Sequence, residues 1–160
     1  MATSLVMYEE EFSRIHTVCE RLIRETHAKV VFLVDKNGQL ITAAGLTQHV
    51  DTTSLASLTA GNVAAMGGLA RLIGENEFPH QFHEGTKESL YMTVVGGRVV
   101  LVVVFDTQKS SLGLVRLRIK KASDELMRIL ESVTMRSEYS GAASPFAEIS
   151  DADIENLFSE

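Results

Sequence analysis

Apolar residues recur along this chain with two different spacings, and the changes of spacing divide it into eight elements. Steps of three and four residues predict helices with one buried face. They cover residues 7–26, residues 52–73 and a stretch that begins near Ser110 or Ser111 and continues to 133. Short apolar or alternating runs predict strands between these helices. The strands cover residues 29–34, 39–44, 78–85, 90–95 and 98–105, which gives the order α-β-β-α-β-β-β-α.

Turn-forming residues connect the predicted strands. Asn37-Gly38 and Gly96-Gly97 each separate two apolar runs, and such pairs supply the positive φ angles of tight hairpin turns. The run from 99 to 105 is apolar throughout, so we expect a central strand that is covered on both faces. Pro79 has no backbone N–H to donate, which restricts segment 78–85 to the edge of the sheet. An edge strand is able to pair with a second subunit.

The helix predicted at 52–73 has two unlike faces, with Asp51 or Thr52 as its N-cap and Gly74 as its end. One face carries the larger apolar side chains, so we expect it to lie on the core. Its members are Leu55, Leu58, Ala65, Met66, Leu69, Leu72 and Ile73. The opposite face carries small residues where a solvated helix normally shows Glu, Lys and Gln. Its members are Thr53, Ala56, Ser57, Ala60, Ala64, Gly67 and Arg71, with Gly68 on the flank.

Glycines within this helix require a compensating contact. Each of Gly61, Gly67 and Gly68 costs up to about 1 kcal/mol of helix stability relative to alanine. Close approach by a second helix or by a partner protein would offset that cost. The alternative is a helix that is buried on both sides within one domain. We favour an interface, because a chain of 160 residues rarely has enough layers to bury a central helix all round.

Length and composition indicate one globular domain with a short appendage. The apolar runs are too short to span a membrane, and the first residues lack the basic start and apolar stretch of a secretory signal. We therefore expect a cytoplasmic protein. Cys19 occupies an apolar position of the first predicted helix, so we expect a small core residue rather than a reactive thiol.

The net charge of −6 is unevenly distributed. Most of it comes from five acidic residues in the last twenty, which contain no Lys or Arg: Glu148, Asp151, Asp153, Glu155 and Glu160. The rest of the chain is close to neutral and shows no clustered basic surface. This distribution argues against a nucleic-acid-binding protein.

No arrangement of residues predicts a catalytic site. No Gly-Lys-Ser/Thr sequence follows Gly67, Gly68 or Gly74, so the chain lacks a phosphate-binding loop and is not expected to bind GTP itself. His80 and His83 stand beside Glu84, but the spacing does not match a zinc site, and we interpret them as surface residues. No Gly-x-Ser-x-Gly elbow occurs. We expect neither a metal nor another cofactor, and no enzyme activity of the chain itself.

The C-terminal residues form a separate unit in the sequence. We predict a domain at 1–135, a flexible tether rich in Ser, Gly and Ala at 136–147, and a short amphipathic helix within 148–160. The apolar residues of this last segment are Phe146, Ile149, Ile154, Leu157 and Phe158. A helix this short is marginal alone, so we favour folding on a partner's groove. The alternatives are docking back on its own domain or disorder.

With this order of elements, four sequence blocks resemble the Roadblock/LC7 family over about residues 7–135. The blocks are VVFLVDKNG (30–38), LASLTAGNVAAM (55–66), FHEG (82–85) and LGLVRL (112–117). The tail, with PFAEIS (145–150) and LF (157–158), is similar to that of one bacterial branch of the family. The resemblance implies an α/β sandwich with a five-stranded antiparallel sheet.

The resemblance also implies a homodimer that activates one Ras-like small GTPase in bacterial cell polarity and gliding motility, clustered at a cell pole. It places the edge strand of the dimer at Gln81, Phe82, His83 and Glu84. It places the GTPase interface at Ala56, Ala60, Ala64, Gly67, Gly68 and Arg71. The C-terminal helix would contact the GTPase separately and promote nucleotide exchange. GTP and Mg²⁺ would be bound by the partner.

Activation in this family is thought to reshape the GTPase's own catalytic residues, so Arg71 and Arg98 are not assigned as arginine fingers. A different class of function remains open. The same surfaces would serve a scaffold that anchors a polarity complex without changing hydrolysis, and the sequence alone does not separate the two. An independent enzyme has no motif in its support.

Overall fold

The computed structural model describes the chain from residue 9 to residue 142, with side chains described as far as residue 133. The elements are α1 (Glu9–Thr26), β1 (Val30–Asp35), β2 (Leu40–Gly45), α2 (Thr52–Leu72), β3 (His80–Glu84), β4 (Ser89–Val95), β5 (Val99–Phe105) and α3 (Leu112–Ala142). The predicted order of elements is therefore confirmed. One boundary differs, because α3 continues through residues 136–142, which the sequence assigned to a flexible tether.

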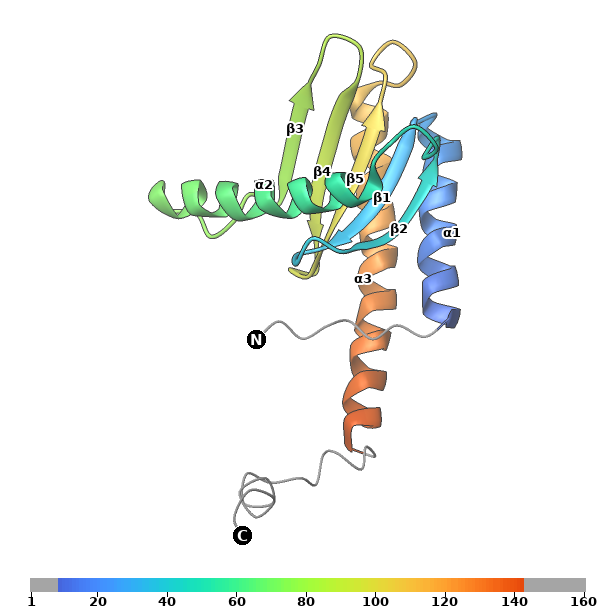
Figure 1. Cartoon of the computed structure of the whole chain (residues 1–160), viewed down its shortest axis with the longest axis vertical. Helices are drawn as coiled ribbons and strands as arrows, with labels where there is room; N and C mark the ends of the chain where they lie inside the picture. The colour runs from blue at the N-terminus through green and yellow to red at the C-terminus, as the bar shows by residue number, and fades with distance from the viewer. Residues whose placement is uncertain (1–8, 143–160) are drawn as a thin grey trace.

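The five strands form one antiparallel sheet in the order β2-β1-β5-β4-β3. The central strand is β5, and six of its seven residues are buried, as its apolar sequence predicted. The edge strands are β2 and β3 (Figure 1). Pro79 precedes β3 directly, so the missing N–H does not interrupt the ladder.

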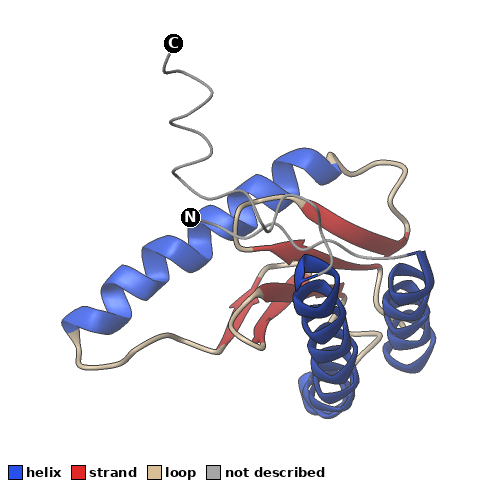
Figure 2. Ribbon diagram, turned by 90° about the horizontal axis from the view of Figure 1, so that it is seen from below, coloured by secondary structure: helices blue, strands red, loops and turns tan. Residues whose placement is uncertain are grey.

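Helices cover both faces of the sheet, which gives three layers (Figure 2). α1 and α3 lie side by side on one face, and α2 crosses the other. The core beneath α1 and α3 contains Ile15, Leu101, Phe105 and Leu126, all fully buried. The core beneath α2 is smaller. Its buried members are Val30, Phe32, Val34, Ala56, Val63, Met92, Val100 and Val102.

Local hydrogen bonds fix the ends of α2 and the start of α3. Asp51 caps α2, because its Oδ1 accepts a hydrogen bond of 3.0 Å from the backbone N–H of Ser54. Gly74, at φ +87°, follows the last turn of α2 in the left-handed region that ends many helices. Ser111 caps α3 by accepting from the N–H of Leu114 at 3.1 Å.

The two predicted hairpin turns form in different ways. Gly96 and Gly97 both have positive φ, as a type I′ turn requires. In the β1–β2 turn only Gly38 does, at φ +90°, and Asp35 Oδ1 accepts hydrogen bonds from the N–H groups of Asn37 and Gln39. The side chain of Asp35 thus holds this turn in a compact shape against α2. Among the described residues, no helix is both long and apolar enough to cross a membrane.

Candidate functional surface on helix α2

The orientation of α2 on the sheet differs from the sequence-based expectation. Its buried residues form a strip of mostly small side chains: Ala56, Thr59, Val63, Gly67 and Ala70. The larger apolar residues, expected to face the core, are largely exposed: Leu58 by 72%, Leu69 by 47%, Leu72 by 84% and Ile73 by 65%. Leu55 and Met66 of the same predicted face are half-buried, and Leu55 packs against the core. For the other members, the prediction that this face lies on the core is wrong. Residue size misled it, because a helix that lies close to a sheet buries its small residues.

Outside the buried strip, the exposed surface of the helix divides into two adjacent flanks. We call one the large flank, formed by Leu58, Ala65, Leu69, Leu72 and Ile73. We call the other the small flank, formed by Ser57, Ala60, Ala64, Gly68 and Arg71. At about 100° per residue, each flank is a continuous row along the helix. One helix therefore presents two chemically different surfaces.

The six residues predicted as a GTPase interface do not share one surface. Ala56 is 1% exposed and Gly67 is buried, so both lie on the side of the helix that faces the sheet. Ala60 and Gly68 are half-buried, whereas Ala64 and Arg71 are exposed. Ala60, Ala64, Gly68 and Arg71 belong to the small flank, and Gly67 lines the groove beside it, whereas Ala56 is enclosed beneath the helix.

The β1–β2 turn explains part of the requirement for small residues. A Cβ atom placed on Gly38 would lie 3.4 Å from the Cα of Ser57 and 3.6 Å from the Cβ of Ala60. The close approach that the sequence predicted is therefore made, at this point, by the chain's own hairpin. No such neighbour explains Gly61 or Gly68, where an added Cβ would meet nothing within 4 Å. Within the described chain, no close contact compensates for the helix stability that Gly61 and Gly68 cost.

A groove of about 480 Å³ runs along the small flank. Its walls come from α2, the β1–β2 turn and the loop that follows α2. It is lined by Lys36, Ala60, Val63, Ala64, Gly67, Arg71, Asn76 and Glu77. Lys36, Asn76 and Glu77 were not predicted from the sequence. They lie in turns far apart along the chain, and no local sequence pattern indicates that such residues come together in the fold.

The groove is polar at its rim and apolar at its floor. Lys36 Nζ lies 2.9 Å from Glu77 Oε1 and ties the β1–β2 turn to the loop after α2. The Arg71 guanidinium lies over Gly67, and no ion pair to it occurs in the part of the chain that the structure describes. Its five donors are suited to carboxylate or carbonyl groups of a partner. This arrangement provides binding groups, not a nucleophile with its base.

The β3 edge of the sheet is a second candidate surface for a partner. Within residues 9–142, β3 pairs with β4 alone, and the C-terminal half of α2 projects past β3 in both views (Figures 1 and 2). Phe82 and His83 are exposed on this strand, and the Phe82 ring stacks on Phe105 with centroids 6.2 Å apart. The predicted edge position of Gln81, Phe82, His83 and Glu84 is thus confirmed.

The histidines of β3 form hydrogen bonds within the chain. Nδ1 of His80 lies 3.0 Å from Thr93 Oγ1, and Nε2 of His83 lies 3.3 Å from Gln81 Oε1. Across residues 9–133 there is no group of three or more His, Cys, Asp or Glu side chains placed to hold a metal ion. Cys19 is fully buried as predicted, and burial raises the pKa of its thiol to about 12, which makes it unreactive.

The residues predicted for the C-terminal contact lie outside the described part of the chain. These are Phe146, Ile149, Ile154, Leu157 and Phe158. The structure therefore gives no geometry for them.

Comparisons with known proteins agree with this architecture. The family model described as Roadblock/LC7 domain matches residues 14–105. The solved structure of Myxococcus xanthus MglB is 77% identical, with a TM-score of 0.77 over 81% of this chain and 96% of that one. The gliding protein MglB from Thermus thermophilus is 36% identical, with a TM-score of 0.75 over 82% of this chain and 99% of that one.

A third structure, described as MglB with tetrameric arrangement, is 34% identical, with a TM-score of 0.77 over 83% of this chain and 99% of that one. A search of curated proteins gave no match. The family model covers more than half of the chain, and the Myxococcus xanthus relative matches 81% of it. This chain therefore belongs to the Roadblock/LC7 family.

Proposed function

We propose that this protein is a homodimeric activator of a Ras-like small GTPase of the MglA type and acts in bacterial cell polarity and gliding motility. The observation that carries the proposal is the small flank of α2. Its glycine at 68 has open space around it, and the groove beside it exposes Ala64 and Arg71. A flat flank with few side-chain atoms lets the backbone of another protein come close, which supports GTPase binding at Ala60, Ala64, Gly68 and Arg71.

Activation in this proposal is indirect. The chain contributes binding groups, and the GTPase holds GTP and Mg²⁺ and performs the hydrolysis. Arg71 lies on the rim of the groove, where it would orient a switch region of the GTPase rather than enter its active site. An inserted arginine typically contributes about 10³–10⁵ in rate, so a comparable effect without one requires a change in the GTPase's own catalytic residues.

The large flank and the β3 edge support self-association. Leu69, Leu72 and Ile73 lie at the end of α2 that projects past β3. A second copy that paired its β3 with this one would bring its own α2 beside these side chains. Asn62, also on this side of the helix, has a buried Oδ1 with no hydrogen-bond partner in the described structure, so a second chain would complete its environment. The tetrameric arrangement of a relative agrees with a surface that forms oligomers.

The C-terminal segment forms a second contact in this proposal. Its apolar residues Ile154, Leu157 and Phe158, with Phe146 and Ile149 upstream, would bind the GTPase away from the α2 surface and assist nucleotide exchange. The support is the amphipathic spacing of these apolar residues and the high density of acidic residues between them.

Single-turnover GTP hydrolysis tests the proposal. The GTP-loaded GTPase is mixed with a saturating amount of this protein, and the rate is compared with that of the GTPase alone. We expect acceleration by the wild type and none by Ala64→Arg combined with Gly68→Arg, because two long side chains would hold the partner away from the small flank.

The matched control is Gly113→Arg, which also adds an arginine at a helical glycine with nothing within 4 Å but lies on α3, on the other face of the sheet. It should accelerate hydrolysis like the wild type. Tight binding with no acceleration by any variant would instead indicate a scaffold, and acceleration by the double variant would contradict the proposed surface.

A further inference from the structure

A second groove lies between α1 and α3, on the side of the sheet away from α2. Its wide part has a volume of about 620 Å³ and extends from Glu10 to Arg21 along α1. Val18 and Ile129, both almost fully buried, form its apolar floor. Beyond Arg21 the two helices close on each other, and Arg118 and Lys121 lie beside this closed part. None of the surfaces assigned above uses it.

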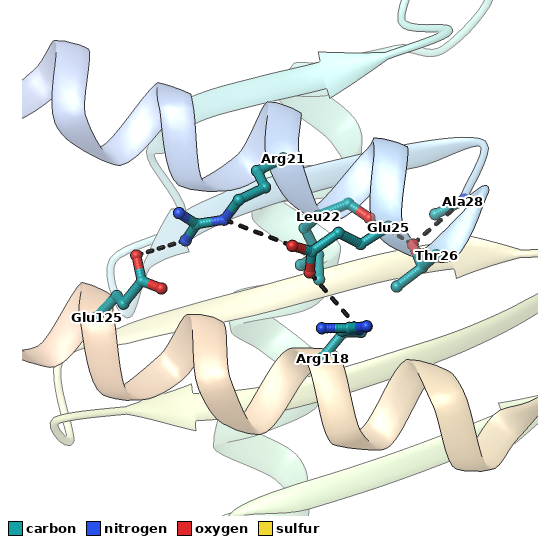
Figure 3. Close-up of polar contacts among 7 residues, drawn as sticks. All are labelled: Arg21, Leu22, Glu25, Thr26, Ala28, Arg118 and Glu125. Carbon is teal, nitrogen blue, oxygen red and sulfur yellow. Dashed lines mark hydrogen bonds and ion pairs between the residues drawn. The ribbon is translucent and has the colours of Figure 1, made fainter.

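The rim of this groove has an excess of positive charge. The groove and the closed part beside it carry five basic side chains, namely Arg14, Arg21, Arg118, Lys121 and Arg128, against the three acids Glu10, Glu25 and Glu125. Two of the acids are already engaged (Figure 3). Glu125 accepts a hydrogen bond from Arg21, which raises the pKa of that guanidinium, and Glu25 lies 3.7 Å from Arg118 and 3.9 Å from Arg21.

The basic side chains that remain define what the groove can bind. Arg14, Lys121 and Arg128 form no ion pair with any residue that the structure describes. Arg14 and Arg128 line the groove around its apolar floor at Val18 and Ile129, and Lys121 lies beside the closed part. An apolar floor with a basic rim fits an amphipathic segment that is acidic on its outer side.

We propose that this groove binds the C-terminal segment of the same chain. Ile154, Leu157 and Phe158 are spaced three and four residues apart, so a helical segment would place all three on Val18 and Ile129. Asp151, Asp153 and Glu155 would then lie near the basic rim. The segment carries acidic charge and no Lys or Arg, which is the complement of the groove.

The length of chain beyond α3 is sufficient for this contact. α3 ends at Ala142, which at 1.5 Å per residue is about 20 Å beyond Ile129. The next seven residues, 143–149, span up to about 24 Å when extended. They can return the chain to the level of Arg128, and a helix over 150–158 of about 13 Å then fits along the groove.

Docking in this groove would hold the segment away from any second partner. The contact is within one chain and depends on no GTPase, so it stands or falls separately from the proposed function. If the segment also serves as the second GTPase contact, its release from the groove would become a step at which that contact is regulated.

Disulfide formation within the full chain tests the contact. Thr17→Cys places a thiol in the groove, and Phe158→Cys places one in the segment; the native Cys19 is buried and stays unreactive. The control pair is Glu131→Cys with Phe158→Cys. Glu131 is exposed, lies outside the groove and is nearer to Ala142 along the chain, so a segment that moves freely would react there at least as fast.

We expect the Thr17 pair to form its intramolecular disulfide at least about tenfold faster than the Glu131 pair. Adding Arg14→Glu and Arg128→Glu should lower that rate to the control value, with the helical circular dichroism unchanged. Equal rates for the two pairs, or a disulfide that links two chains, would overturn the proposal.

Discussion

The two faces of the sheet differ in how completely one chain covers them. On the α1 and α3 face, long side chains from both helices and from the strands are fully buried together, including Ile15, Leu101, Phe105 and Leu126. On the α2 face, the helix contributes mainly small buried residues, and Leu58, Leu69 and Leu72 remain exposed. The first face serves stability within the chain. The second leaves apolar side chains exposed, which supports the proposal that it binds other proteins.

Truncation of a core side chain under α1 and α3 should have the largest effect on stability. Phe105→Ala is expected to lower the free energy of unfolding by about 3–5 kcal/mol, because it removes a fully buried ring. Urea denaturation at fixed protein concentration measures this loss. Leu117→Ala, on the exposed side of α3, is the control and should change the value by less than about 0.5 kcal/mol.

Substitutions on the large flank should weaken self-association rather than the stability of the protomer. Leu69→Asp combined with Leu72→Asp is expected to weaken self-association at least about tenfold, which corresponds to about 1.4 kcal/mol, without unfolding the protomer. Sedimentation velocity over a range of concentrations measures the shift. Leu117→Asp is the control, because the exposure of Leu117, on the other face of the sheet, lies between those of Leu69 and Leu72. An unchanged dissociation constant for the double variant would show that this flank is not an interface.

A substitution at Gly61 tests whether the glycines of α2 are needed by the chain itself. Gly61→Ala should raise the free energy of unfolding by up to about 1 kcal/mol, since nothing lies within 4 Å of the added Cβ and alanine favours the helix. Gly38→Ala should lower it, because its φ is +90° and the Cα of Ser57 is 3.4 Å from the added atom. Thermal unfolding of both variants measures whether each substitution raises or lowers the stability. Destabilisation by Gly61→Ala would contradict the presence of open space beside this glycine.

The smallest effect is expected at the N-cap of α2. Hydrogen bonds from the Ser54 side chain and backbone lower the pKa of Asp51, so folding favours its charged form. Its contribution is complete above the ordinary aspartate pKa of about 3.9 and is lost as the pH falls through the lower folded-state value. Asp51→Asn should therefore melt below the wild type at pH 7, and this difference should shrink as the pH falls below about 4. A constant difference would exclude a role for the charge.

Periodicity and turn residues predicted the eight elements, the edge position of β3 and the central position of β5. They predicted the wrong orientation for α2, because the largest apolar side chains were expected to face the core. A helix that lies close to a sheet buries small residues instead, here Ala56, Val63 and Gly67. The groove with Lys36 and Glu77 was also missed, since no local pattern shows that these two residues meet. The composition of 136–142 suggested a tether where α3 continues.

Sedimentation of the Ala64→Arg, Gly68→Arg variant, alone and mixed with the GTP-loaded GTPase, tests most directly the central claim that the flanks of α2 serve different partners. We predict the oligomeric mass of the wild type for the variant alone and no added mass in the mixture, while Gly113→Arg binds the GTPase normally. A variant that loses its oligomeric state, or one that still binds the GTPase, would contradict the claim.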